Sequence, residues 1–100
     1  MIKHIVMWNL KDNALGNEKD ENAVKMKEQL EGLQGKIQEL QKIEVGINIL
    51  PSPQSFDVVL YSEFKSVEDL NTYQNHPEHL KIVGFIRQVV SQRVACDYEL

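Results

Sequence analysis

The first ten positions of the chain are mostly apolar, interrupted by Lys3, His4 and Asn9, and this short run predicts a β-strand. Isoleucine, valine and tryptophan are enriched there, and no glycine or proline interrupts the pattern. Because successive side chains of a strand point to opposite faces, one face carries His4, Val6, Trp8 and Leu10. His4 therefore stands in an otherwise apolar row, either as a core histidine bonded to the backbone or as a group that lines a cavity.

Three further segments predict strands. Residues 42–49 alternate isoleucine and valine with polar positions, and residues 56–64 follow after a proline-containing turn at 51–55. Residues 93–100 predict a last strand. The residues of this last strand that we expect to face the core are Val94, Cys96 and Tyr98.

Between the first two strands, apolar residues recur at spacings of three and four, which predicts a helix with one apolar stripe. We expect Asn17 to cap its beginning and Gly35 to end it. The stripe consists of Ala23, Met26, Leu30, Leu33 and Ile37. A second helix is predicted from Ser66, which opens a capping-box pattern, to Tyr73, and a third helix begins at Pro77.

The order strand, helix, strand, strand, helix, helix, strand predicts an α+β fold of the ferredoxin-like type, with a single domain over residues 1–100. Its four strands would form an antiparallel sheet with the helices on one face. Apolar residues occupy both faces of several strands, and the helices can cover only one. The residues left on the open face would be Ile5, Met7, Val59 and Tyr61. Such a face is typical of an interface, so we expect a homodimer that stacks two sheets into a dimeric α/β barrel.

The composition is that of a globular protein, with 42% hydrophobic and 26% charged residues. A net charge of −4 argues against a nucleic-acid partner, which would require a basic patch. No stretch has the length of a membrane span, and the N-terminal apolar run lacks the features of a signal peptide. The single cysteine, Cys96, cannot form an internal disulfide. We therefore expect a cytoplasmic protein without a membrane partner.

Two of the three histidines lie within residues 73–80, next to a tyrosine and a carboxylate. Proline disfavours a helical conformation in the residue before it, so Asn75-His76-Pro77 predicts a helix break. Tyr73 would then end one helix, and His79 would fall in the first turn of the next. Titratable groups gathered at a helix junction predict a small-molecule site, while the simpler alternative is an ordinary surface turn.

Other kinds of site have less support in the sequence. A metal site built from His76, Glu78 and His79 is disfavoured, because the chain has neither a cysteine cluster nor a His-Glu-x-x-His pattern. No glycine-rich phosphate loop and no Gly-x-Ser-x-Gly elbow occur either. We therefore expect no metal and no cofactor.

Five segments in this order resemble the stress-responsive dimeric α/β-barrel (Dabb) family. They are Lys3–Trp8, Glu44–Gly46, Phe56–Phe64, His76-Pro77-x-His79 and Val94–Tyr98. The resemblance implies a ferredoxin-like monomer whose sheet packs against that of a partner across a two-fold axis. Some family members resemble olivetolic acid cyclase, a plant polyketide cyclase that closes a linear poly-β-ketone by aldol chemistry without a cofactor. Their catalytic tyrosine and histidine match Tyr73 and His79, and their pocket histidines match His4 and His76.

The chemistry of these groups suits proton abstraction next to a carbonyl. An imidazole with a pKa near 6.5 can act as the base, which we assign to His79. A phenol can hold the developing enolate oxygen, which we assign to Tyr73. His4 and His76 are expected to bind the substrate, together with the apolar residues Val6 and Trp8. The function hypothesis is a cofactor-free cyclase or isomerase, and the alternative is a non-catalytic module that binds a small apolar or carbonyl-containing ligand or serves a stress response.

Overall fold

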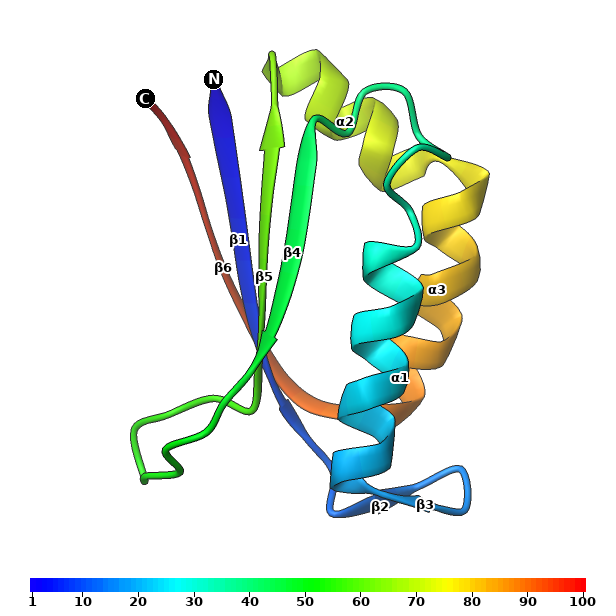
Figure 1. Cartoon of the computed structure of the whole chain (residues 1–100), viewed down its shortest axis with the longest axis vertical. Coiled ribbons are helices and arrows are strands. Elements are labelled where there is room, and N and C mark those ends of the chain that lie inside the picture. Colours follow the sequence, from blue (N-terminus) through cyan, green and yellow to red (C-terminus); the bar gives the residue numbers. More distant parts are fainter.

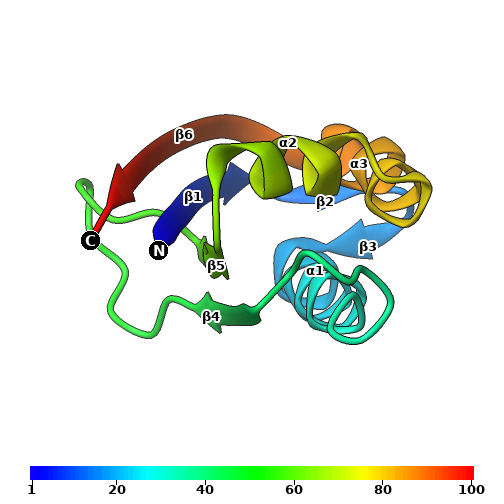
Figure 2. The ribbon, with the colours of Figure 1, turned by 90° about the horizontal axis from the view of Figure 1, so that it is seen from above.

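A four-stranded antiparallel sheet forms one layer of the protein, and three helices cover one of its faces (Figure 1, Figure 2). The computed structural model describes residues 1–100. In chain order the elements are β1 (Ile2–Leu10), β2 (Asn13–Ala14), β3 (Asn17–Glu18), α1 (Lys19–Glu31), β4 (Lys42–Ile47), β5 (Val58–Phe64), α2 (Val67–Asn75), α3 (Pro77–Val89) and β6 (Val90–Glu99). The sheet order β4-β5-β1-β6 is the predicted ferredoxin-like arrangement, and β2 and β3 form a separate short hairpin.

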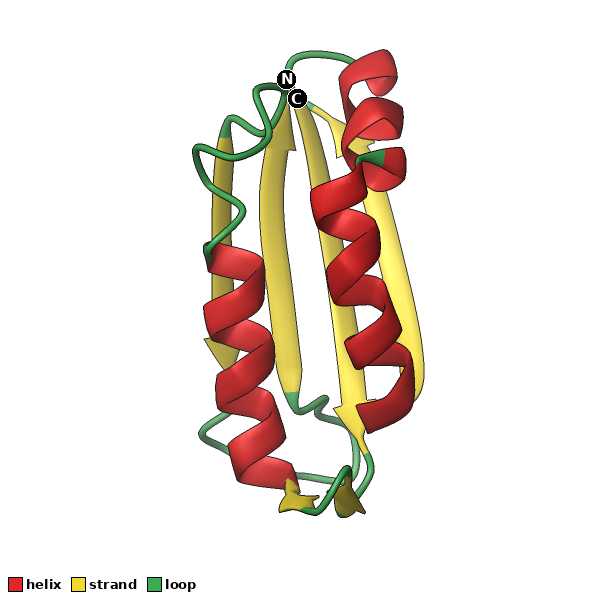
Figure 3. Ribbon diagram, turned by 90° about the vertical axis from the view of Figure 1, so that its right-hand side faces the viewer, coloured by secondary structure: helices red, strands yellow, loops and turns green.

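The central strand β1 places its even-numbered residues under the helices. It pairs antiparallel with β5, where Val6 lies opposite Leu60 and Trp8 opposite Val58. All of these side chains are buried. Figure 3 shows α1 in front of the β4 and β5 half of the sheet and α3 in front of the β1 and β6 half. The predicted face of β1 is therefore confirmed, because its apolar row fills the space between the two layers.

The core consists of 19 buried apolar residues that lie between the sheet and the helices. Met26, Leu30, Leu33 and Ile37 of the predicted stripe are all buried within it, and Phe64 is fully buried at the end of β5. Burial of apolar area on one side of the sheet supplies the main favourable free energy of folding. None of the helices combines the length and the apolar character that spanning a bilayer requires.

The boundaries of α1 differ from the prediction. Asn17 belongs to the short hairpin rather than capping the helix, whose N-cap is Glu18. The helix ends at Glu31, and Gly35 instead occupies a turn with a φ of +88°. The chain turns here while Leu33 and Ile37 stay buried, because a turn can keep apolar residues on the core side without helical hydrogen bonds.

The inner face of β6 was predicted wrongly. In the register of the sheet, His4 lies opposite Asp97 and Trp8 opposite Arg93, so these polar residues of β6 share the helix-covered face. Val94 and Cys96 lie opposite Met7 and Ile5 on the other face, and Cys96 is exposed. An apolar row in an edge strand can mark an outer contact surface as well as a core, so hydrophobicity alone does not determine its orientation. The strand also starts earlier than predicted, directly after α3.

No helix covers the second face of the sheet (Figure 2). This open face carries Met7 and Val59, which are each 37% exposed, together with the outer row of β6. Its end near the termini is polar, because Glu63 accepts hydrogen bonds from Lys3 at 2.9 Å and from the Tyr61 hydroxyl at 2.6 Å. The open face thus combines an apolar centre with a fixed polar group at one end.

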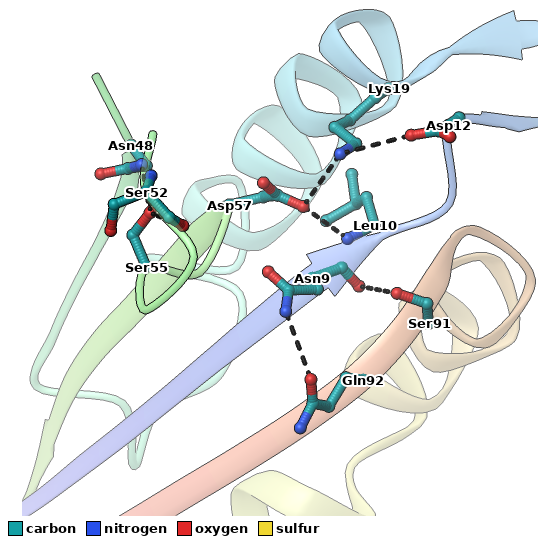
Figure 4. A network of polar contacts seen from close by, with 10 residues as sticks. All are labelled: Asn9, Leu10, Asp12, Lys19, Asn48, Ser52, Ser55, Asp57, Ser91 and Gln92. Carbon is teal, nitrogen blue, oxygen red and sulfur yellow. Dashed lines mark hydrogen bonds and ion pairs between the residues drawn. The ribbon is translucent and has the colours of Figure 1, made fainter. Parts of the chain in front are cut away.

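A polar network secures the far end of β1, opposite the termini (Figure 4). The Asp57 carboxylate accepts a hydrogen bond from the backbone N–H of Leu10 at 2.8 Å and lies 3.6 Å from the Lys19 ammonium. On the other side of β1, the Asn9 amide donates to Gln92 at 3.3 Å. The strand β5 starts at Val58, two residues later than predicted, although the backbone of Asp57 still bonds to Trp8 and to Asn48 at 2.9 Å each.

Candidate functional site

A cavity of about 410 Å³ lies between the sheet and α3. Its floor is the buried face of β1, which contributes His4, Val6 and Trp8, and its apolar walls include residues of α3 such as Val83 and Ile86. The volume is toward the small end of the range usual for ligand cavities. Apolar walls with a few polar groups are the usual composition of such sites.

Four of the six predicted site residues line this cavity. They are His4, Val6, Trp8 and His79. Tyr73 and His76 are not among the lining residues, although both lie close to His79 in the chain. The parity of β1 and the helix break therefore bring together one histidine from the sheet and one from α3.

His79 has the geometry of a neutral base. Its Nδ1 lies 3.1 Å from the backbone carbonyl of Gln74. A carbonyl can only accept, so Nδ1 carries the proton and Nε2 keeps the free electron pair. Burial lowers the pKa of His79, and the hydrogen bond to Gln74 offsets part of this shift. Electrostatic interactions with His4, Arg93 and His76 lower the pKa of His79 further, so its ring is uncharged at neutral pH.

Tyr73 supports His79 from within the core. It is fully buried, and its ring centroid lies 4.6 Å from that of His79 and 4.9 Å from that of Phe64. Burial raises the pKa of the Tyr73 phenol, which therefore stays protonated. Its hydroxyl makes no hydrogen bond within the chain. The predicted role of Tyr73 as an oxyanion donor stays a prediction, and its position is that of a packing partner for the His79 ring.

His76 ends one helix and caps the next. As predicted, the break separates α2, which ends at Asn75, from α3, which starts at Pro77. The Nδ1 atom of His76 accepts a hydrogen bond from the backbone N–H of Glu78 at 3.1 Å, which is the usual role of an N-cap side chain. The predicted contact of His76 with substrate stays a prediction. In the free chain the Nδ1 atom of His76 is used by the helix cap, and His76 does not line the cavity.

His4 is held by a residue that the sequence did not reveal. It is 3% exposed, and its Nδ1 forms a close hydrogen bond with the Asp97 carboxylate on the neighbouring strand. Because the carboxylate accepts through Nδ1, Nε2 is the atom left for other partners. The sequence did not predict this role of Asp97, because Val94, Cys96 and Tyr98 of this strand were expected to face the core.

Two arginines complete the cavity and were also missed. Arg87 lies two turns after His79 on α3, and Arg93 lies on β6 opposite Trp8. One feature of the sequence could have drawn attention to them, since they are the only arginines of the chain. The structure gathers no group of three or more histidine, cysteine, aspartate or glutamate side chains that could hold a metal ion.

The family model of the stress responsive A/B barrel domain, Dabb, matches residues 2–100. The chain belongs to this family. This Dabb chain is 26% identical over 98 residues to the stress-response A/B barrel domain-containing protein DABB1 of Arabidopsis thaliana. The match covers 98% of the chain but 46% of that relative, so the chain spans about half of its length.

Solved structures share the fold of this Dabb domain. A dimeric protein of unknown function with a ferredoxin-like fold from Bacteroides fragilis is 36% identical, with a TM-score of 0.88, and the match covers 99% of this chain and 95% of that one. The hydroxynitrile lyase of Passiflora edulis is 20% identical, with a TM-score of 0.75 and coverage of 97% and 90%. The second likeness concerns the fold alone.

The lowered pKa of His79 predicts a dependence of stability on pH. The unfolded chain binds a proton at this histidine near its ordinary pKa of 6.5, whereas the folded chain binds it only at lower pH. The contribution of His79 to the free energy of unfolding is therefore fully present above pH 6.5 and is lost as the pH falls through the lower value. Urea unfolding at several pH values should show a smaller loss for His79→Gln than for the wild type. NMR titration of the His79 ring with a midpoint above 6.5 would contradict the assignment.

The capping role of His76 predicts how two substitutions differ. His76→Ala removes the acceptor for the Glu78 N–H and should lower the free energy of unfolding by about 1 kcal/mol. His76→Asn restores a good capping oxygen and should recover most of that loss. If His76→Asn is as stable as the wild type yet binds ligand more weakly, then the imidazole also contacts the ligand.

Proposed function

We propose that the cavity is the active site of a cofactor-free enzyme that abstracts a proton next to a carbonyl group, with His79 as the base. One observation carries the proposal. A half-buried, uncharged imidazole has its Nδ1 bound to Gln74 and lines a mainly apolar cavity, so its free Nε2 is available to a ligand there. A base whose pKa is kept from rising by its surroundings stays in the active form at neutral pH.

The proposed reaction moves one proton and one electron pair. Nε2 of His79 takes the proton from a carbon beside a carbonyl, and the electrons of the broken C–H bond form an enolate. In an isomerisation, the imidazolium returns the proton to a different carbon. In an aldol cyclisation, the enolate carbon attacks a second carbonyl of the same molecule, and the proton goes to the new alkoxide. The polyketide cyclase type of reaction is one case of the second kind.

The enolate oxygen needs a hydrogen-bond donor. The predicted donor is the Tyr73 phenol, which stays protonated because burial raises its pKa. Its ring packs against His79, so Tyr73 can also act by holding the imidazole in place. The two roles differ in what they need, because ring packing requires only the phenyl ring, whereas donation requires the hydroxyl.

A second candidate function is a non-catalytic binding module for a small apolar or carbonyl-containing ligand. The predominantly apolar wall of the cavity is compatible with it, since most of the lining residues are hydrophobic. An enzyme, the hydroxynitrile lyase, shares the fold, but at 20% identity this likeness does not favour catalysis here. The two functions differ in the effect of substituting His79. In an enzyme the substitution slows proton abstraction, whereas in a binding module it changes only the affinity for the ligand.

The first test measures exchange of α-protons of β-keto esters and 1,3-diketones in D₂O by NMR, with the chain free of added cofactor. His79→Ala should slow the enzymatic exchange by about 10²–10⁴-fold, the usual contribution of a general base. Tyr73→Phe should slow it by about a hundredfold or more if the hydroxyl is the oxyanion donor, and should leave it nearly unchanged if the ring only positions His79. Exchange that is equally fast with His79→Ala, while a ligand still binds, would favour the binding module.

We further propose that the chain is a homodimer through its open sheet face. The relative from Bacteroides fragilis is described as dimeric, and the proposal transfers this assembly to a chain 36% identical to it. The apolar centre of the open face, with Ile5, Met7 and Val59, has no cover within the chain. A two-fold contact would bury this patch on both subunits at once.

A charge on the open face should disrupt the dimer. Met7→Asp would bury an unpaired carboxylate in an apolar interface, at a cost of several kcal/mol. Sedimentation velocity at micromolar concentration should show a dimer for the wild type and a monomer or unfolded chain for Met7→Asp. Val67→Asp is the matched control, because Val67 is an exposed apolar residue in the first turn of α2 on the helix side. A wild type that sediments as a monomer would overturn the assembly.

A further inference from the structure

The only two arginines of the chain line the same cavity. Arg87 comes from α3 and Arg93 from the edge strand β6, so two elements that are adjacent in sequence place both guanidinium groups around one space. Both side chains are exposed, which places them where the cavity opens to solvent. Neither guanidinium group forms a hydrogen bond or an ion pair within the chain.

This lack of partners distinguishes the arginines from several lysines. Lys3, Lys27 and Lys81 each pair with a glutamate. Two carboxylates of β6 lie on the same sheet face as Arg93. Asp97 is already bound to His4, and Glu99 stands at the far end of the strand, opposite Ile2; neither lines the cavity. In a chain with a net charge of −4, the cavity therefore holds two cationic groups that no acidic side chain neutralises.

A guanidinium group differs from an ammonium group in the ligand that it suits. Its planar set of N–H donors matches the two oxygens of a carboxylate, and such paired hydrogen bonds are stronger than neutral ones. The remaining lining is mainly apolar, with Val6 and Trp8 on the floor and Val83 on the wall. The cavity thus offers a cationic opening and an apolar interior.

We infer that the cavity takes an amphipathic carboxylic acid, whose carboxylate is held by Arg87 and Arg93 while its apolar body lies against Val6, Trp8 and Val83. The inference rests on the proposed function only in placing the ligand in the same cavity. Combined with His79 as base, it narrows the substrate class to oxo acids, in which the carboxylate is anchored at the opening and the reacting carbonyl lies further in. The reaction itself leaves this carboxylate unchanged.

The test compares a carboxylate with a neutral ligand of the same shape. Octanoate and octanamide are titrated into the full-length chain by calorimetry and by the fluorescence of Trp8, which is the only tryptophan and lines the cavity. We expect octanoate to bind about tenfold or more tightly than octanamide, and its affinity to fall as salt is raised. Shorter and longer alkanoates, from hexanoate to dodecanoate, cover differences in chain length.

Variants assign the preference to the two arginines. Arg87→Gln and Arg93→Gln should each weaken octanoate binding about fivefold or more and leave octanamide binding unchanged, and Arg93→Lys should recover only part of the loss. Lys81→Gln is the matched control, because it removes one charge from the exposed side of α3 outside the cavity and should change neither affinity. Circular dichroism of each variant shows whether the fold is retained.

Three results would overturn the inference. These are equal affinities for octanoate and octanamide, a preference that survives both arginine substitutions, and no binding of any alkanoate in the series at millimolar concentration. The same experiments distinguish a failure of this inference from a failure of the proposed catalysis. Proton exchange that depends on His79 without any carboxylate preference would remove the inference and leave the enzyme. Octanoate binding that depends on the arginines, without any proton exchange, would keep the carboxylate inference and remove the proposed catalysis.

Discussion

The pairing of the central strand β1 with both of its neighbours is the constraint on which the remaining structure depends. A slip of one residue would move every side chain to the opposite face. In the observed register, His4, Val6 and Trp8 all lie under the helices, where they form the floor of the cavity. The same register brings Asp97 to His4 and Arg93 to Trp8 across the β1–β6 pair. One set of backbone hydrogen bonds therefore determines both the core and the polar groups of the site.

The helix break between α2 and α3 has a comparable role on the other wall. Proline at the first position of α3 forces the chain out of the helix at His76, whose ring then satisfies the free N–H of Glu78. The first turn of α3 consequently begins at the right distance for His79 to reach the carbonyl of Gln74 and the ring of Tyr73. The burial of Tyr73 against Phe64 links this corner to the core, so the position of the imidazole depends on packing as well as on the break.

The two faces of the sheet differ in what covers them. One is closed by helices except where the cavity opens, and the arginines stand at that opening. The other is left bare, with an apolar centre and the polar group of Lys3, Tyr61 and Glu63 at one end. Since Cys96 and Val94 lie on the bare face, the apolar row of β6 contributes to that surface and not to the core. The polar inner row of β6 then supplies Arg93 to the cavity and Asp97 as the hydrogen-bond partner of His4.

What the sequence determined by itself is local. The apolar run of residues 1–10, the capping pattern at Ser66 and the break at Pro77 each act within a few residues. The order of the four sheet strands and three helices, the fold class and the positions of His4 and His79 could therefore be predicted. The start of α1 could not, because the β2–β3 hairpin takes Asn17. Nor could the partnership of His4 with Asp97, 93 residues away, or the meeting of Arg87 with Arg93 at one cavity. The orientation of an edge strand and the contacts across it follow from pairing between distant segments, which only the tertiary structure decides.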